Sequence, residues 1–294
     1  PQHQSVLEDR LAQTILKLRM DDKSGLITKP AHILNKAYNG SVKKQTLRNL
    51  NLASIHGWIA YDIYDDFLDE EGSLAKLPLA NKAARQMCDY FAQSLPGNIP
   101  FRKQVQSVLN TLDAANIWEL RNARATKKNG RLVYKLADYK SYRHLAEKSF
   151  GILLAPIGVA IISNKPIQPL IKFFTHFLIA RQLNDDAHDW EEDLIHGHIS
   201  AVVSMVLRNT KPNSCVIERD LPELRRYFWQ TTIHDISSLI QHHCSQARLL
   251  FEDCEFVQTK EIQNLLKPLE LAAEEAKNES RKASEFLGTL HDIS

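Results

Sequence analysis

The stretch that decides the fold is Trp58-Ile-Ala-Tyr-Asp-Ile-Tyr-Asp-Asp-Phe-Leu-Asp-Glu-Glu-Gly72. Asp62, Asp65, Asp66 and Asp69 stand at i, i+3, i+4 and i+7, so four carboxylates share one face of a helix. Like charges at this spacing destabilise an isolated helix, and a divalent cation is the natural compensation. Oxygen ligands without His or Cys favour Mg²⁺ over zinc. The alternative for a single acidic run is a solvated helix face.

A second acidic stretch, Arg181-Gln-Leu-Asn-Asp-Asp-Ala-His-Asp-Trp-Glu-Glu-Asp193, follows an almost wholly apolar segment, 173–180. An apolar helix that ends in an acidic cluster directs its carboxylates from a core into a cavity. Mg²⁺ held by few carboxylates completes its shell with water and phosphate oxygens. Two facing clusters therefore predict a diphosphate substrate bridged by several Mg²⁺ ions. The polar residues near one face of this helix are Gln182, Asp185, Asp186, Asp189 and Asp193.

The rest of the chain has the character of one helical domain. It contains only 10 glycines and 11 prolines in 294 residues, which is poor in turn formers. Apolar residues recur at three- and four-residue spacing, and no Ser-, Gly- or Pro-rich linker divides the chain. We therefore expect a single all-α domain over residues 1–294. Breaks are expected at 95–100, 127–130, 163–166 and 209–214.

Charge and cysteine content exclude several classes of protein. The net charge is +2, so nothing in the charge balance indicates binding to nucleic acid or to an anionic membrane. The four cysteines form no CxxC pair, which favours reduced thiols in a cytoplasmic protein. The longest apolar run, 151–162, is too short for a transmembrane helix, and no signal-peptide pattern is present. The chain begins at Pro1 rather than Met, so we expect a trimmed or excised piece.

Two DDxxD motifs, 65–69 and 185–189, give the chain a family resemblance. Over residues 25–200 it resembles the superfamily of trans-isoprenyl diphosphate synthases and class I terpene synthases. The resemblance implies an antiparallel helical bundle with a deep central cavity, and commonly a homodimer. It also implies three Mg²⁺ ions that grip a prenyl diphosphate. The implied metal ligands are Asp65, Asp66, Asp69, Asp185, Asp186 and Asp189.

Several smaller matches follow in the family's order. Gln182 stands where the family has its Phe-Gln pair, and Lys148-Ser149 resembles a Lys-Thr that touches diphosphate. The stretch 193–200 resembles a degenerate Asp-Leu-x-x-Gly-Lys-x-Thr, with His198 in place of Lys. Lys148 would act on diphosphate as a point charge, or it is an ordinary surface lysine. Arg181 either contacts phosphate or orients Asp185, four residues further on.

Aromatic residues are candidates for the substrate pocket. In the resembling family, the positions of Ala60 and Tyr61 form the floor of the prenyl pocket, and bulk there shortens the accommodated chain. Other aromatic rings would line the pocket and stabilise a carbocation by cation–π contact, or they pack in the core. These residues are Trp58, Tyr64, Phe150, Phe177 and Trp190.

The departures from the family pattern bear on the reaction. Chain-elongating synthases carry Gly-Lys-Arg-x-Arg-Pro where this chain has Gly25-Leu-Ile-Thr-Lys-Pro30, and no Arg pair follows Gly72. Those basic residues hold isopentenyl diphosphate, and Leu26 and Ile27 cannot. We therefore expect a class I terpene synthase, a diphosphate lyase that ionises a linear prenyl diphosphate. The second DDxxD motif keeps a prenyltransferase as the alternative, since terpene synthases usually carry an Asn-Ser/Thr-Glu triad there. A third hypothesis is an inactive homologue with a regulatory role.

Overall fold

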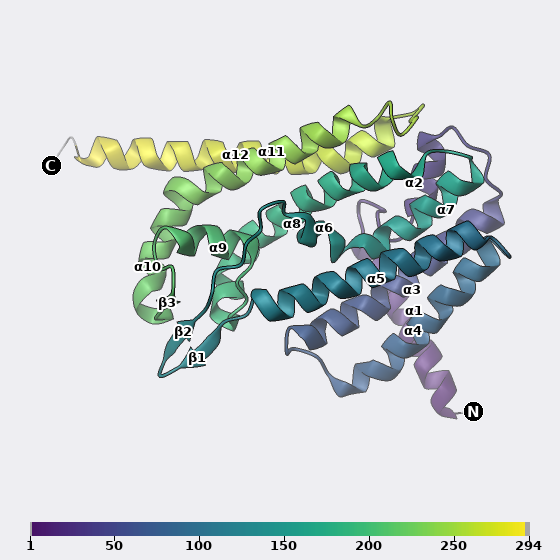
Figure 1. Cartoon of the computed structure of the whole chain (residues 1–294), viewed down its shortest axis with the longest axis horizontal. Helices are drawn as coiled ribbons and strands as arrows, with labels where there is room; N and C mark the ends of the chain where they lie inside the picture. Colours follow the sequence, from purple (N-terminus) through teal and green to yellow (C-terminus); the bar gives the residue numbers. More distant parts are fainter. Residues whose placement is uncertain (1, 292–294) are drawn as a thin grey trace. The chain divides into compact units, whose positions relative to one another are not determined.

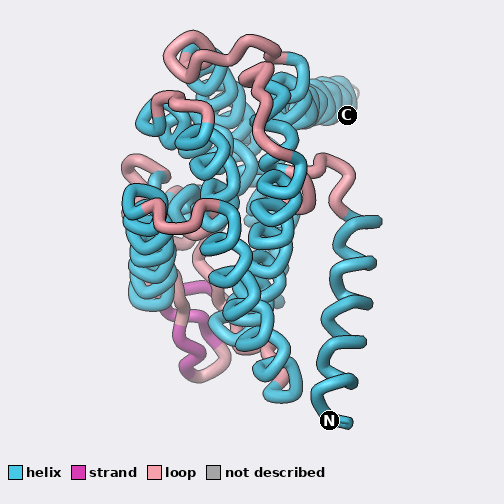
Figure 2. The backbone as a smooth tube through the Cα atoms, turned by 90° about the vertical axis from the view of Figure 1, so that its right-hand side faces the viewer, coloured by secondary structure: helices cyan, strands magenta, loops and turns pink. Residues whose placement is uncertain are grey.

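The computed structural model describes the backbone of residues 2–291 and the side chains of residues 6–282. Helices dominate, and the strands form one small sheet (Figures 1 and 2). The predicted all-α class is confirmed. The breaks predicted at 95–100, 163–166 and 209–214 fall at or beside helix ends, and the break at 127–130 falls in a β hairpin. Within residues 2–291, no helix combines the length and the apolar character that crossing a lipid bilayer requires.

The chain forms two compact units, each assembled from separate segments. Unit 1 comprises residues 1–112, 149–171 and 250–265, and unit 2 comprises residues 113–148, 172–249 and 266–294. Three helices have residues in both units: α5 (Ile99–Asn122), α8 (Ile167–His196) and α12 (Lys260–His291). The single domain expected over residues 1–294 stays a prediction.

Unit 1 is built around a close pair of helices, α3 and α4, which run side by side (Figure 1). Its elements are α1 (Gln2–Asp21), α2 (Pro30–Ala37), α3 (Lys44–Leu68), the 3-10 turn η1 (Leu74–Lys76), α4 (Leu77–Ser94), the 3-10 turn η2 (Phe150–Leu153) and α7 (Leu154–Ile162). Small residues permit the approach, because a Cβ on Gly57 would lie 2.8 Å from the sulfur of Met87. Ile59 and Ile63 of α3 bury against Leu79 of α4.

Unit 2 combines helices with a short hairpin. Its elements are β1 (Thr126–Lys128), β2 (Arg131–Val133), α6 (Arg143–Glu147), α9 (Ala201–Arg208), β3 (Ser214–Cys215), α10 (Ile217–Tyr227), the π-helical turn η3 (Phe228–Thr232) and α11 (Ile233–Leu249). Asn129 and Gly130 both have positive φ, as a two-residue hairpin turn requires. Strand β2 also pairs with β3, where Leu132 lies opposite Cys215 and both are buried.

A pair of histidines lies in contact within unit 2. The Nδ1 atoms of His176 on α8 and His243 on α11 are 2.9 Å apart, so one ring donates a hydrogen bond to the other. Burial lowers the pKa of His243 to about 4, and the neighbouring His176 and His242 add to this effect. Burial also lowers the pKa of His176. Both rings are therefore neutral in the folded protein near pH 7.

This pair predicts a loss of stability in acid. An unfolded histidine takes up a proton near pH 6.5, whereas folded His243 resists protonation down to about pH 4. The free energy of unfolding therefore falls as the pH drops through this window, by roughly 2 kcal/mol between about pH 7 and about pH 5. Urea unfolding of the wild type and of His243→Gln at both pH values measures the effect. Equal pH dependence in the two proteins contradicts it.

Candidate functional site

The first acidic cluster occupies the last turn of α3, in unit 1. Glu70 adopts a left-handed conformation with φ +64°, and the N–H of Glu71 donates to the carbonyl of Asp66 over 2.8 Å. These features form a Schellman-type helix end. Gly72 lies against the ring of Phe67, because an added Cβ would approach that ring to 2.5 Å. The local sequence therefore ends the helix at Leu68, and Asp69, the last residue of the DDxxD motif, is the C-cap.

The helix end concentrates negative charge. Asp65, Asp66 and Asp69 lie where the helix dipole is negative, and the last turn of α3 contains no basic residue. Lys76 gives partial compensation through a 2.8 Å ion pair with Asp66. Burial raises the pKa of Asp62, and the charge of Asp66 raises it further. A bound cation would relieve this repulsion.

The second acidic cluster lies on α8, in unit 2, and Asp186 is its most buried member. Gln182 donates a 2.8 Å hydrogen bond to Oδ1 of Asp186. The other oxygen, Oδ2, is buried and has no hydrogen-bond partner in the described part of the chain. Burial raises the pKa of Asp186 to about 7, although the bond from Gln182 acts in the opposite direction. A buried carboxylate oxygen without a partner is costly, and an absent cation is one explanation for it.

Arg181 contacts the neighbouring carboxylate. Its Nε atom lies 3.7 Å from Oδ2 of Asp185, across one helical turn. Burial raises the pKa of Asp185, and the charge of Arg181 lowers it. This contact supports the interpretation that Arg181 orients Asp185, and a role on phosphate stays a prediction.

The donor set of both clusters fits Mg²⁺ shared with a phosphate group. All the candidate ligands supply carboxylate oxygens, which Mg²⁺ prefers. Among the described residues, no three His, Cys, Asp or Glu side chains gather closely enough to hold a metal by themselves. An ion bound by one or two carboxylates, with water and phosphate completing its shell, needs no such gathering.

Lys148 belongs to a buried charge network that the sequence did not reveal. Its Nζ lies 2.5 Å from Oε2 of Glu119, a carboxylate at the end of α5. Arg124 and His198 approach the other oxygen of Glu119, at 3.5 Å and 3.6 Å. The side chain of Glu119 is only 10% exposed. Lys148 is therefore a partly buried, ion-paired lysine rather than a solvated one.

Backbone pairing brings this network together. The N–H of Ala125 donates to the carbonyl of Gly197, and the N–H of Ile199 donates to the carbonyl of Ala123, both over 2.8 Å. His198 is thereby held beside the end of α5, with its Nδ1 3.3 Å from Asp193. Burial lowers the pKa of His198, but the bond to Asp193 and the charge of Glu119 raise it above the ordinary value on balance. His198 can thus share the cationic role that the resemblance assigns to lysine at this position.

The aromatic candidates have different surroundings. Trp190 stacks on Phe228 at 5.1 Å, and Phe177 packs against Phe174 at 6.2 Å, so these two belong to the core of unit 2. In unit 1, Phe150 is buried, Trp58 is half-buried, and Tyr61 meets Tyr64 edge to face. Contact of Trp58, Tyr61 or Phe150 with a substrate stays a prediction.

The segment that departs from the family's basic motif is an ordered loop in unit 1. The Asp22 carboxylate accepts hydrogen bonds from the backbone N–H groups of Ile27 and Thr28, at 3.0 Å and 2.8 Å. This fixes a turn in which Leu26 is 4% and Ile27 9% exposed. Two apolar side chains thus pack into the protein at the positions where the resembling family carries basic residues.

Comparison with solved structures identifies the fold. A geranylgeranyl pyrophosphate synthetase from the archaeon Geoglobus acetivorans aligns with a TM-score of 0.62 and 12% identity, over 92% of this chain and 98% of that chain. The chain has the fold of the trans-isoprenyl diphosphate synthases. An octaprenyl pyrophosphate synthase from Helicobacter pylori also aligns, with a TM-score of 0.49 and 14% identity, over 94% of this chain and 98% of that one. No protein-family model matches the sequence, and comparison with curated proteins finds no match.

The predicted fold is thereby confirmed. The trans-isoprenyl diphosphate synthase fold carries the first acidic cluster in unit 1 and the second in unit 2. That the two clusters face one another across a deep cavity stays a prediction.

Proposed function

We propose that the chain is a Mg²⁺-dependent enzyme of the prenyltransferase kind that ionises an allylic prenyl diphosphate. The observation that carries the proposal is the buried Oδ2 of Asp186, which has no partner among the described residues and lies within a DDxxD motif. The name of the archaeal neighbour, a geranylgeranyl pyrophosphate synthetase, supports the same substrate class. The three Mg²⁺ ions, the homodimer and the cytoplasmic location stay predictions.

Each charged residue has a role in this proposal. The ligands for Mg²⁺ are Asp65, Asp66, Asp69, Asp185, Asp186 and Asp189. Mg²⁺, when bound, neutralises the charge that develops on the departing diphosphate. Gln182 holds Asp186 in place, and Arg181 does the same for Asp185. Lys148 has three N–H donors, so it can keep its pair with Glu119 and still donate to a diphosphate oxygen.

A second candidate function is a class I terpene synthase, and the burial of Leu26 and Ile27 favours it. A diphosphate placed against two apolar side chains would remain uncompensated, at a cost of several kcal/mol. Elongation with isopentenyl diphosphate is therefore disfavoured at that position. The cation would then cyclise, lose a proton, react with water, or alkylate an acceptor that lacks a diphosphate.

Product analysis separates these functions. The protein is incubated with Mg²⁺ and geranyl, farnesyl or geranylgeranyl diphosphate, with and without isopentenyl diphosphate. Longer diphosphates that form only with isopentenyl diphosphate support an elongating prenyltransferase. Diphosphate release with a hydrocarbon or alcohol as product, unchanged by isopentenyl diphosphate, supports the terpene synthase. Failure to release diphosphate from any of the three contradicts both and favours an inactive homologue.

A further inference from the structure

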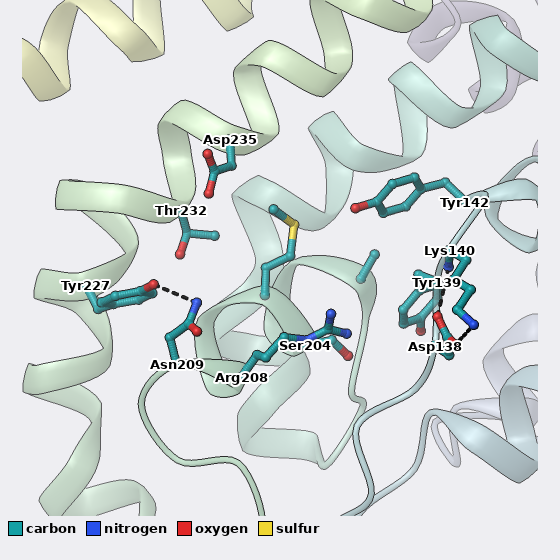
Figure 3. Close-up of a pocket in the computed structure, with 12 residues that line it drawn as sticks. Asp138, Tyr139, Lys140, Tyr142, Ser204, Arg208, Asn209, Tyr227, Thr232 and Asp235 are labelled. Carbon is teal, nitrogen blue, oxygen red and sulfur yellow. Dashed lines mark hydrogen bonds and ion pairs between the residues drawn. The ribbon is translucent and has the colours of Figure 1, made fainter.

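Unit 2 contains a polar pocket of about 280 Å³ that none of the proposed metal or diphosphate residues lines (Figure 3). Its walls come from the segment before α6, the end of α9, the π-helical turn η3 and the start of α11. The lining residues that matter here are Tyr142, Ser204, Arg208, Thr232 and Asp235.

Two opposite charges enter this pocket from different elements. Arg208 extends from the end of α9, and Asp235 comes from the first turn of α11 (Figure 3). Within the described part of the chain, neither side chain makes a hydrogen bond or an ion pair. By contrast, Lys140 and Asp138 at the pocket edge pair with each other at 3.2 Å. The pocket therefore offers one guanidinium and one carboxylate that are not matched to each other.

A threonine adds a hydroxyl to the pocket wall. Thr232 is only 2% exposed and lines the pocket (Figure 3). A hydroxyl can donate one hydrogen bond and accept others, which suits a polar ligand.

The backbone of two walls has rare conformations. Tyr142 has φ +52° and ψ 7°, which is unusual for a bulky residue without a local glycine. On another wall, α10 passes into α11 through the five-residue π-helical turn Phe228–Thr232. Both features cost free energy and gather at functional sites, where the surrounding structure maintains them.

Tyr142 lines the same pocket as the two charged residues, and both charges act on its hydroxyl. Burial raises the pKa of Tyr142, the charge of Arg208 lowers it, and the charge of Asp235 raises it. The ring of Tyr142 also meets His243 edge to face, which fixes its direction. Tyr142 thus lies within the fields of both Arg208 and Asp235.

We propose that this pocket binds a small zwitterionic molecule of the chemical class of amino acids, with its carboxylate on Arg208 and its ammonium on Asp235. Arginine matches a carboxylate with two parallel N–H donors, and an aspartate accepts from an ammonium. The hydroxyls of Tyr142 and Thr232 complete the polar lining. The proposal is independent of the proposed enzymatic function, because it uses none of the same residues.

Isothermal titration with a matched series tests the proposal on the full chain. The probes are ω-amino acids from glycine to 6-aminohexanoate, each compared with the carboxylic acid and the amine of equal length. We expect an amino acid of one chain length to bind with a Kd of about 1 mM or tighter. It should bind about tenfold more tightly than the carboxylic acid or the amine of the same length. The proposal is overturned if no amino acid binds more tightly than the carboxylic acid and the amine of equal length.

Single substitutions test which residue binds the carboxylate of the ligand and which binds its ammonium group. Arg208→Met and Asp235→Asn alter exposed side chains, so both variants are expected to fold. Each should weaken binding of the best amino acid by about tenfold or more. Arg208→Met should also leave the affinity for the matching amine unchanged. Arg226→Met, an equivalent change on α10 outside the pocket, is the control. Equal affinity in wild type and Arg208→Met excludes the assignment.

Discussion

Asp186→Asn is expected to reduce diphosphate release by roughly 10²–10³-fold or more and to stabilise the metal-free protein against unfolding. The asparagine keeps an oxygen that can accept the bond from Gln182, but it removes the charge that a cation would need. Without a cation, the fold buries a carboxylate that is costly to ionise, and this burial raises the pKa of Asp186 to about 7. Its neutral replacement should therefore raise the free energy of unfolding by about 1–3 kcal/mol.

The two opposite changes make this test specific. A structural defect would lower activity and stability together, whereas a metal ligand is lost at no cost to the metal-free fold. Phosphate-release assays give the first quantity, and urea unfolding in the presence of a chelator gives the second. Asp89→Asn, an exposed position on α4, should change neither quantity. Near-normal turnover by Asp186→Asn would show that the metal assignment is wrong.

The local features of the fold were predictable from the sequence. The acidic positions at i, i+3 and i+4 define one helix face by themselves, and both DDxxD motifs lie on helices. Three of the predicted breaks lie between helices, because clusters of Pro, Gly and Asn favour turns over helix. Single prolines such as Pro222 and Pro268 lie inside helices, so a lone proline was a weaker signal. The exact end of α3 was harder to predict from the sequence. Glu70 has the left-handed conformation that glycine usually adopts at a helix end.

The features that depend on distant parts of the chain were not predictable. Strands β1, β2 and β3 have two or three residues each, too few to show an alternating pattern. The contact between Glu119 and His198 depends on backbone pairing of residues 123–125 with residues 197–199. Trp190 illustrates the same limit, because an aromatic residue in the core and one in a pocket look alike in sequence.

Glu119→Ala is expected to lower the free energy of unfolding by about 3–5 kcal/mol, because it removes the shared acidic partner of Lys148, Arg124 and His198. The cations would then repel one another in a setting where the side chains of Lys148 and His198 are each 17% exposed. Glu119→Gln keeps an acceptor for Lys148 and should cost less, about 1–2 kcal/mol. Urea unfolding at neutral pH measures both.

A matched surface pair shows whether burial or distance decides the size of this loss. Arg225 and Glu191 form an ion pair at 2.5 Å, as short as that of Lys148 and Glu119, but their side chains are 54% and 31% exposed. Glu191→Ala should therefore cost less than about 1 kcal/mol, since water screens the pair and replaces it. Equal losses in Glu119→Ala and Glu191→Ala would contradict the buried network. If Lys148 also binds diphosphate, inorganic pyrophosphate with Mg²⁺ should restore more stability to Glu119→Ala than to the wild type, because the added anion replaces the missing carboxylate.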